Sequence, residues 1–112
     1  MIEQIQPQHL NDWIAALAGN APLLLDVREA SECRVASVHP PGAELLQWPM
    51  HTIPLRCAEL DPGRPTAILC HHGGRSMQVA LFLQQRGFSR LANIAGGIDA
   101  WAVQLDPSLA RY

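Results

Sequence analysis

Two short, unbroken apolar runs constrain the fold of this chain most strongly, because each one ends at polar residues that lead into another element. The first contains Leu23, Leu24 and Leu25, followed by Val27, and the second is "TAILC", residues 66–70. Runs of this kind are typical of strands that are buried on both faces. Helix-like segments alternate with them along the chain. The alternation predicts an α/β fold in which helices cover both faces of a parallel sheet.

Weaker signals place the remaining elements. Residues 7–20 predict a helix, because Leu10, Trp13, Ile14 and Leu17 follow helical spacing and Gly19 suits a left-handed stop. Further strands are expected within 45–49 and 90–97, and further helices within 53–63, 76–87 and 98–105. In the 53–63 helix, Ile53, Cys57 and Leu60 are expected to point inward.

Length and composition exclude several classes of protein. The 112 residues fit one domain, residues 1–112, and the net charge of −2 with interspersed signs does not favour a nucleic-acid-binding face. No apolar run approaches the roughly 20 residues that cross a bilayer. The first residues do not resemble a secretory signal. We therefore expect a cytoplasmic protein without a membrane partner, either a monomer or a weak homodimer, whose three cysteines are thiols.

The segment "CHHGGRS", residues 70–76, is the strongest chemical signal. Cys70 ends a predicted strand, and a helix begins within about one turn, so unpaired N–H groups and the helix dipole favour an anion there. Gly73 and Gly74 let the backbone curl so that successive N–H groups point inward. Arg75 adds a fixed positive charge. Each factor favours the thiolate, which is the nucleophilic form of cysteine. Cys33 and Cys57 lack such neighbours and are interpreted as small buried apolar residues.

Three motifs in fixed order resemble one family. "LLLDVREASE", "CHHGGRSMQVALFLQQRGF" and "NIAGGIDAW" are together similar to single-domain rhodanese-like (thiosulfate sulfurtransferase-like) proteins, over about residues 2–101. The resemblance implies a five-stranded parallel sheet and a six-residue active loop, Cys70 to Arg75. It also implies that Cys70 accepts sulfur, that backbone N–H groups from His71 to Arg75 hold the persulfide, and that no cofactor takes part. The segment "SVHPPGAELLQWP" departs from the family's usual pattern.

Charged residues after the first apolar run have two interpretations. Arg28 either lies near the Cys70 loop and adds positive charge there, or forms a surface ion pair with Glu29 or Glu32, which is worth little. Asp26 is expected to bond backbone or an arginine rather than act as an acid or base, because a carboxylate beside the thiolate would oppose its ionisation.

The histidines of the loop invite a metal site, but two adjacent histidines do not supply the three or four ligands that zinc requires. No metal is therefore expected, and His71 and His72 are assigned to the pocket rim, where a protonated ring would attract anions. Ser76 is expected to cap the following helix, although its hydroxyl could also face the sulfur.

These observations predict a sulfurtransferase that moves sulfur from a small anionic donor such as thiosulfate to cyanide, a thiol or a protein cysteine. Cys70 is the expected nucleophile. The expected substrate-binding residues are Arg28, His71, His72, Gly73, Gly74, Arg75 and Ser76. A persulfide carrier or regulatory module acting on a protein partner remains open, since it needs the same cysteine. A cysteine phosphatase or arsenate reductase is less favoured, because phosphatases use C-x5-R rather than the C-x4-R found here, and an inactive scaffold is least favoured.

Overall fold

A single parallel sheet forms the centre of the protein. The computed structural model describes residues 2–17 and 21–112. Its strands are β1 (Ile2–Ile5), β2 (Leu23–Asp26), β3 (Glu44–Gln47), β4 (Thr66–Leu69) and β5 (Leu91–Ile94). They pair in the order β1-β5-β4-β2-β3, and every pairing is parallel. The three central strands are buried along their whole length, which confirms the interpretation of the apolar runs.

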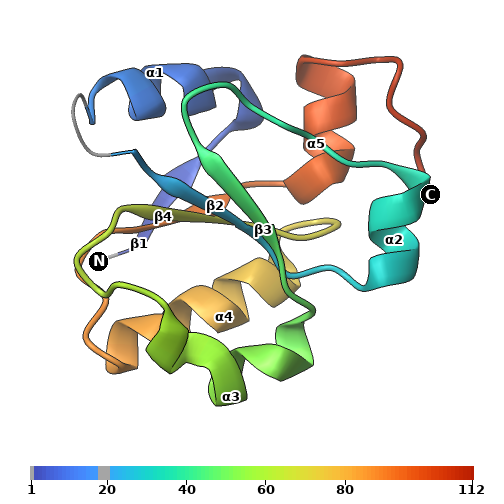
Figure 1. Ribbon diagram of the computed structural model, residues 1–112. Coiled ribbons are helices and arrows are strands. Elements are labelled where there is room, and N and C mark those ends of the chain that lie inside the picture. Colours follow the sequence, from blue (N-terminus) through green and yellow to red (C-terminus); the bar gives the residue numbers. More distant parts are fainter. Residues whose placement is uncertain (1, 18–20) are drawn as a thin grey trace.

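Helices cover both faces of this sheet, as predicted (Figure 1). They are α1 (Leu10–Ala15), α2 (Ala30–Val35), α3 (Ile53–Arg56), α4 (Gly74–Gln85) and α5 (Gly97–Gln104), with short 3-10 turns at Pro7–His9, Met50–Thr52 and Cys57–Glu59. α1 and α5 lie on one face, and α3 and α4 lie on the other. One apolar core fills the space on each side of the sheet.

Two elements were not predicted from the sequence pattern, namely β1 and α2. β1 is an edge strand with two exposed central residues, Glu3 and Gln4, so it carries no apolar run. α2 has no buried residue and therefore no apolar stripe. The capping box between Glu29 and Glu32 helps α2 begin where it does, since each side chain bonds the other residue's backbone N–H.

The first helix is shorter than predicted. A 3-10 turn at Pro7–His9 leads into α1, which ends at Ala15. Leu10 and Trp13 are buried, as expected from their spacing. The predicted stop at Gly19 lies outside the described residues. None of the helices formed by residues 2–17 and 21–112 has the length and apolar character needed to cross a membrane.

The cysteines do not share one environment. Cys70 is buried, and Cys57 is half-buried but packs against the core, as its predicted inward position implies. Cys33 is half-buried and lies outside both core clusters, which corrects the prediction for that residue. Burial and the neighbouring Asp26 carboxylate raise the pKa of Cys33 to about 11, so its thiol stays protonated at neutral pH. Cys33 is therefore poorly suited to act as a nucleophile.

Candidate active site

Cys70 lies directly after the central strand β4, at the edge of the sheet where ligands bind in parallel α/β folds. Its side chain is only 1% exposed, but its sulfur has polar neighbours. The backbone N–H of Gly73 donates to Cys70 Sγ at 3.0 Å. Gly73 has φ +105°, a conformation that favours glycine, and it immediately precedes α4. The turn therefore points one main-chain donor at the thiol, whereas the sequence predicted several converging N–H groups.

Ser76 does not cap α4, because the helix already begins at Gly74 and its N-cap is Gly73. The Ser76 side chain is fully buried. Its hydroxyl oxygen lies 3.2 Å from Cys70 Sγ and 3.1 Å from the Gly73 carbonyl oxygen. Of the two interpretations of Ser76, the structure supports the one in which the hydroxyl faces the sulfur.

The first residues of α5 form backbone hydrogen bonds with the Cys70 loop. The N–H of Ile98 donates to the Cys70 carbonyl at 2.9 Å, and the N–H of Asp99 donates to the His71 carbonyl at 3.1 Å. Gly97, at φ +61°, lies so close to these two carbonyls that a Cβ atom would collide with both. The turn at Gly96 and Gly97 thus packs directly against the backbone of the Cys70 loop, and position 97 has no room for a side chain.

Gly97→Ala is expected to destabilise the protein by roughly 3 kcal/mol, through left-handed backbone strain and overpacking together. Gly87→Ala is a matched control, because Gly87 has φ +90° with no atom within 4 Å of an added Cβ. It should cost only the strain, roughly 1 to 2 kcal/mol. Urea unfolding measures both variants. Equal losses would show that Gly97 does not pack against the loop as described.

Arg75 carries the fixed charge of the loop, and that charge is paired. Its Nη1 and Nη2 donate to the two carboxylate oxygens of Glu32 in α2, both at 2.7 Å. The hydrogen bonds from Arg75 lower the pKa of Glu32 to about 2. Glu32 was not among the predicted site residues. The pair fastens the loop to α2 and partly neutralises the charge that the sequence suggested for the thiolate.

The Arg75–Glu32 pair predicts a pH-dependent stability. Because the pKa of Glu32 falls from 4.5 to about 2 on folding, its contribution is complete above pH 4.5 and is lost as the pH drops toward 2. The difference in free energy of unfolding between wild type and Glu32→Gln should shrink over this interval. Urea unfolding at several pH values measures it, and a difference independent of pH would contradict the ion pair.

The loop histidines stack at the rim of the site. His71 lies between His72 and Tyr112, with ring centroids 3.9 Å apart in both pairs. Burial and, to a smaller extent, the neighbouring His72 lower the pKa of His71, so it carries less positive charge at neutral pH than a free histidine.

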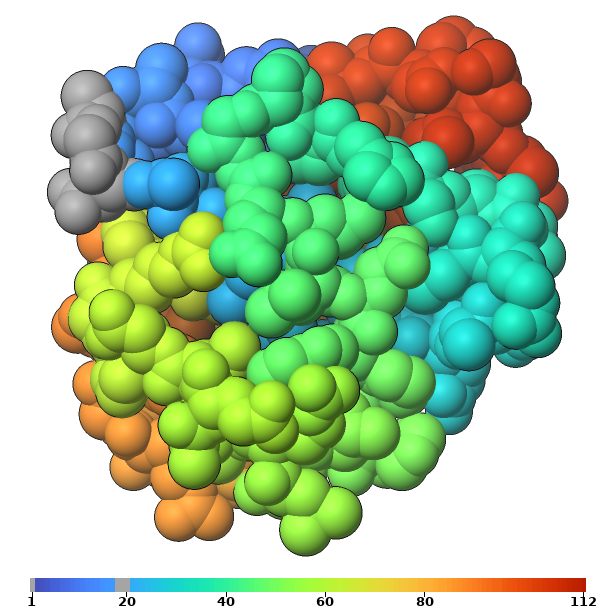
Figure 2. Space-filling view, in the orientation of Figure 1, coloured from blue at the N-terminus to red at the C-terminus, as the bar shows by residue number. Residues whose placement is uncertain are grey.

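Figure 2 shows the C-terminal residues, in red, next to α2 in cyan. There the Tyr112 hydroxyl donates to Glu32 at 2.9 Å.

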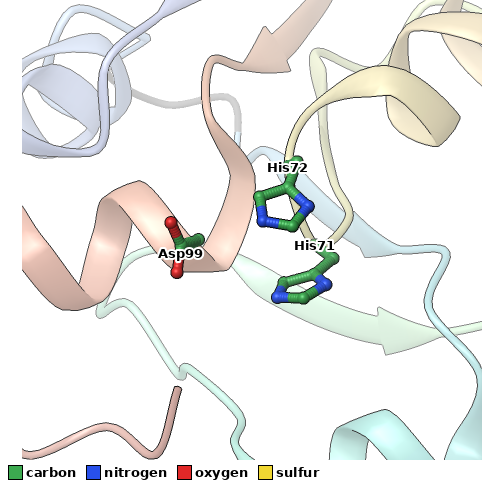
Figure 3. A group of neighbouring side chains, drawn as sticks. All are labelled: His71, His72 and Asp99. Atoms are coloured by element: carbon green, nitrogen blue, oxygen red, sulfur yellow. The ribbon is translucent and has the colours of Figure 1, made fainter. Parts of the chain in front are cut away.

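The side chain of Asp99, from α5, lies near the two loop histidines (Figure 3). Potential ligand atoms of His71, His72 and Asp99 lie within 4.8 Å of one another. The Asp99 carboxylate, however, is engaged by Arg111 at 2.9 and 3.2 Å. The absence of a metal from the reaction stays a prediction from the sequence.

Arg28 is positioned differently from either prediction. It is completely buried and forms its ion pair with Asp26, which is also completely buried, at 2.7 Å. Its remaining nitrogen donates to the Glu32 carbonyl and to Tyr112. Burial alone would lower the pKa of Arg28, but the bonds from Arg28 to Asp26 and Tyr112 hold it above its usual value. In the described chain no hydrogen bond joins Arg28 to residues 70–75, and its guanidinium is bonded to Asp26, the Glu32 carbonyl and Tyr112 instead.

A cavity of about 420 Å³ opens beside the loop. It is lined by Val27, Glu29, Met50, His51, Pro54 and Arg75. Arg28 lines a different cavity, together with Cys33 and Arg34. The cavity at Arg75 therefore borders the loop, whereas the cavity at Arg28 does not include a loop residue.

Cys70 is the first residue of a six-residue loop that follows the central strand β4 and ends at Arg75, as the resemblance to rhodanese-like proteins implies. The profile of the family described as "Rhodanese-like domain" matches residues 10–104. The chain therefore belongs to the rhodanese-like family.

Curated relatives agree with this assignment. The "Rhodanese-like/PpiC domain-containing protein 12, chloroplastic" of Arabidopsis thaliana is 42% identical over 93 residues, which cover 80% of this chain but only 30% of the relative. A protein named "Sulfurtransferase" from Allochromatium vinosum is 38% identical over 102 residues, covering 91% of this chain and 90% of the relative. The chain thus matches a relative named as a sulfurtransferase over nearly the full length of both.

Solved structures show the same fold. The rhodanese-like domain protein from Staphylococcus aureus superposes with a TM-score of 0.74 at 27% identity, covering 99% of each chain. The rhodanese-related protein from Thermoplasma volcanium superposes with a TM-score of 0.73 at 26% identity, covering 92% of this chain and 93% of the other. These similarities confirm the predicted rhodanese-like architecture.

Proposed function

We propose that this protein is a sulfurtransferase that carries sulfane sulfur as a persulfide on Cys70, with thiosulfate or another small anionic persulfide-type molecule as donor. The observation that supports this most directly is the 3.0 Å hydrogen bond from the Gly73 N–H to Cys70 Sγ. A main-chain donor at this distance stabilises negative charge on sulfur without any movement of the backbone. The remaining N–H groups of the loop and the beginning of α4 add to the same field.

The reaction has two displacement steps. The Cys70 thiolate attacks the outer sulfur of thiosulfate, the S–S bond of the donor breaks, and sulfite leaves with the bonding electron pair. Cys70 then bears a persulfide whose terminal sulfur is anionic. An acceptor nucleophile such as cyanide or a thiolate attacks that terminal sulfur, and the Cys70 thiolate leaves. No net oxidation occurs and no cofactor is needed.

The donor must also reach the buried sulfur of Cys70. Because the side chain is 1% exposed, the donor reaches it only when side chains over the loop shift. Arg75, whose charge is shared with Glu32, lies both in the loop and in the wall of the 420 Å³ cavity, so we propose that the donor approaches the loop from this cavity. His72 is exposed and can move without disturbing the core.

The competing hypothesis of a phosphatase or arsenate reductase is tested with the same preparation. Thiocyanate release from thiosulfate and cyanide is measured beside p-nitrophenyl phosphate hydrolysis and arsenate reduction. We expect thiocyanate only, because the loop from Cys70 to Arg75 is one residue shorter than the C-x5-R loop that surrounds a phosphate. Phosphate or arsenate turnover without thiocyanate release would overturn the proposed function.

A further inference from the structure

The cavity of about 420 Å³ beside the Cys70 loop has more apolar wall than thiosulfate needs. Three of its six lining residues are apolar, namely Val27, Met50 and Pro54. Val27 is completely buried and Met50 is half-buried. Thiosulfate presents charged sulfur and oxygen atoms, which charges and hydrogen-bond donors recognise. The apolar side chains of the wall therefore have no part in the reaction described so far.

The apolar surface continues beyond this cavity. Met50 and Pro54 also line a second cavity, of about 260 Å³. Its other wall residues, which come from α3 and α4, are Ile53, Gln78, Val79 and Phe82. α3 and α4 lie on the same face of the sheet (Figure 1). An uncharged surface thus extends from the side of Arg75 across Met50 and Pro54 to the space between α3 and α4.

The charged residues of the first cavity indicate how a ligand would be oriented. Arg75 is paired with Glu32, but 35% of its side chain is exposed, so it still attracts the anionic sulfur end of a substrate. Glu29 and His51 lie 3.9 Å apart and are both mostly exposed, so water screens their charges. The rest of the molecule then lies against Met50 and Pro54, where a charged group would lose water without gaining a partner.

We propose that this cavity binds the apolar substituent of an organic thiol, which makes a neutral thiol with an apolar stem the preferred sulfur acceptor. The inference rests on the proposed function and adds the class of acceptor to it. The acceptor thiolate attacks the terminal sulfur of the Cys70 persulfide and a new S–S bond forms. The Cys70 thiolate leaves with the electron pair of the broken bond. Because pockets for small molecules typically measure about 300 to 1,000 Å³, the cavity suits an acceptor of low mass.

Alkyl methanethiosulfonates test the cavity without any sulfur transfer. The Cys70 thiolate attacks the alkyl-bearing sulfur, the S–S bond of the reagent breaks, and methanesulfinate leaves with the electron pair. Intact mass and peptide mapping follow the alkyl disulfide on Cys70, at reagent concentrations to which the rate is proportional. Each rate is divided by that of N-acetylcysteine with the same reagent, which removes differences in intrinsic reactivity.

We expect the corrected rate at Cys70 to rise about eightfold from the methyl to the n-butyl reagent. This is about twofold per methylene, where complete burial would give roughly fourfold. The 2-sulfonatoethyl reagent should gain nothing over the methyl reagent, because its stem ends in a charge. Equal corrected rates for methyl and n-butyl, or a sulfonatoethyl rate that matches n-butyl, would overturn the inference.

Met50→Gln keeps the length of the side chain and places an amide in the wall shared by both cavities. It should reduce the eightfold gain to less than about twofold and leave the methyl rate unchanged, which shows that the loop is intact. Leu55→Gln is the matched control, because Leu55 of α3 is 88% exposed and lines neither cavity. It should retain the full gain. An eightfold gain that persists in Met50→Gln would contradict the assignment of the stem to this wall.

A second measurement uses the acceptor itself. Cys70 is first loaded with sulfur from thiosulfate, the excess donor is removed, and the loss of the added sulfur is followed by intact mass. At equal thiolate concentration, 6-mercapto-1-hexanol should remove the sulfur about tenfold faster than 2-mercaptoethanol. Equal rates on the loaded protein would overturn the inference. Failure to load any sulfur would count against the proposed function instead, while the methanethiosulfonate series would still decide whether the cavity accepts an apolar stem.

Discussion

Cys70→Ser is expected to reduce thiocyanate formation from thiosulfate and cyanide to the uncatalysed rate, a loss of roughly a thousandfold or more. A serine hydroxyl is about the right size for the site and still accepts the hydrogen bond from the Gly73 N–H. It is not ionised near neutral pH, however, and it cannot carry a persulfide. The loss should therefore appear in the rate of transfer and not in the free energy of unfolding, which urea titration of the same variant measures.

Two other cysteines provide the control for this prediction. Cys33 lines a separate cavity, and the Cys57 thiol lies 3.7 Å from the Pro54 carbonyl in the α3 segment. Cys33→Ser and Cys57→Ser should each transfer sulfur at close to the wild-type rate. Full activity in Cys70→Ser, with activity lost in either of the other variants, would show that Cys70 is not the nucleophile.

Asp26→Ala is expected to have the largest effect on stability, a loss of about 3 to 5 kcal/mol. Asp26 and Arg28 are both 0% exposed. The carboxylate accepts from Arg28 Nη2 at 2.7 Å, from Arg28 Nε at 2.9 Å and from the Arg28 backbone N–H at 3.1 Å. Removing it leaves a buried guanidinium without its counter-charge. Since most domains are stable by only about 5 to 15 kcal/mol, the loss is a large part of the total.

Replacing both partners distinguishes loss of the ion pair from loss of packing. The double variant Asp26→Ala, Arg28→Met should recover most of the stability lost in Asp26→Ala, because no unpaired charge remains. Glu59→Ala removes the partner of Arg56 in an exposed pair and should change the urea midpoint very little. A midpoint for Asp26→Ala that matches the one for Glu59→Ala would show that burial of the Asp26–Arg28 pair is not important to folding.

The fold could be predicted wherever burial leaves a pattern in the sequence. β2 and β4 are buried along their whole length, so their residues are continuously apolar. α2 and β1 are exposed over most of their surface, and tertiary position rather than periodicity determines their conformation. The five-stranded count therefore came from the resemblance to rhodanese-like proteins, not from the pattern of apolar residues.

The site could be predicted where its residues are adjacent in sequence. The loop from Cys70 to Arg75 is continuous, so its chemistry was visible. Glu32 and Asn93 reach the loop from α2 and β5, and only the folded chain brings them there. Asn93 did leave one signal, a polar residue inside the apolar strand "LANI", since a buried amide requires partners. Arg28 was misassigned because spacing does not show that Asp26, two residues earlier, is buried with it.

The most direct test of the account is the intact mass of the protein after incubation with thiosulfate and removal of excess donor. We predict an added mass of one sulfur atom, located at Cys70 by peptide mapping, absent in Cys70→Ser and removed by cyanide. An unchanged mass, or a cyanide-labile sulfur atom found on Cys33 or Cys57 instead, would contradict the assignment of Cys70 as the sulfur carrier.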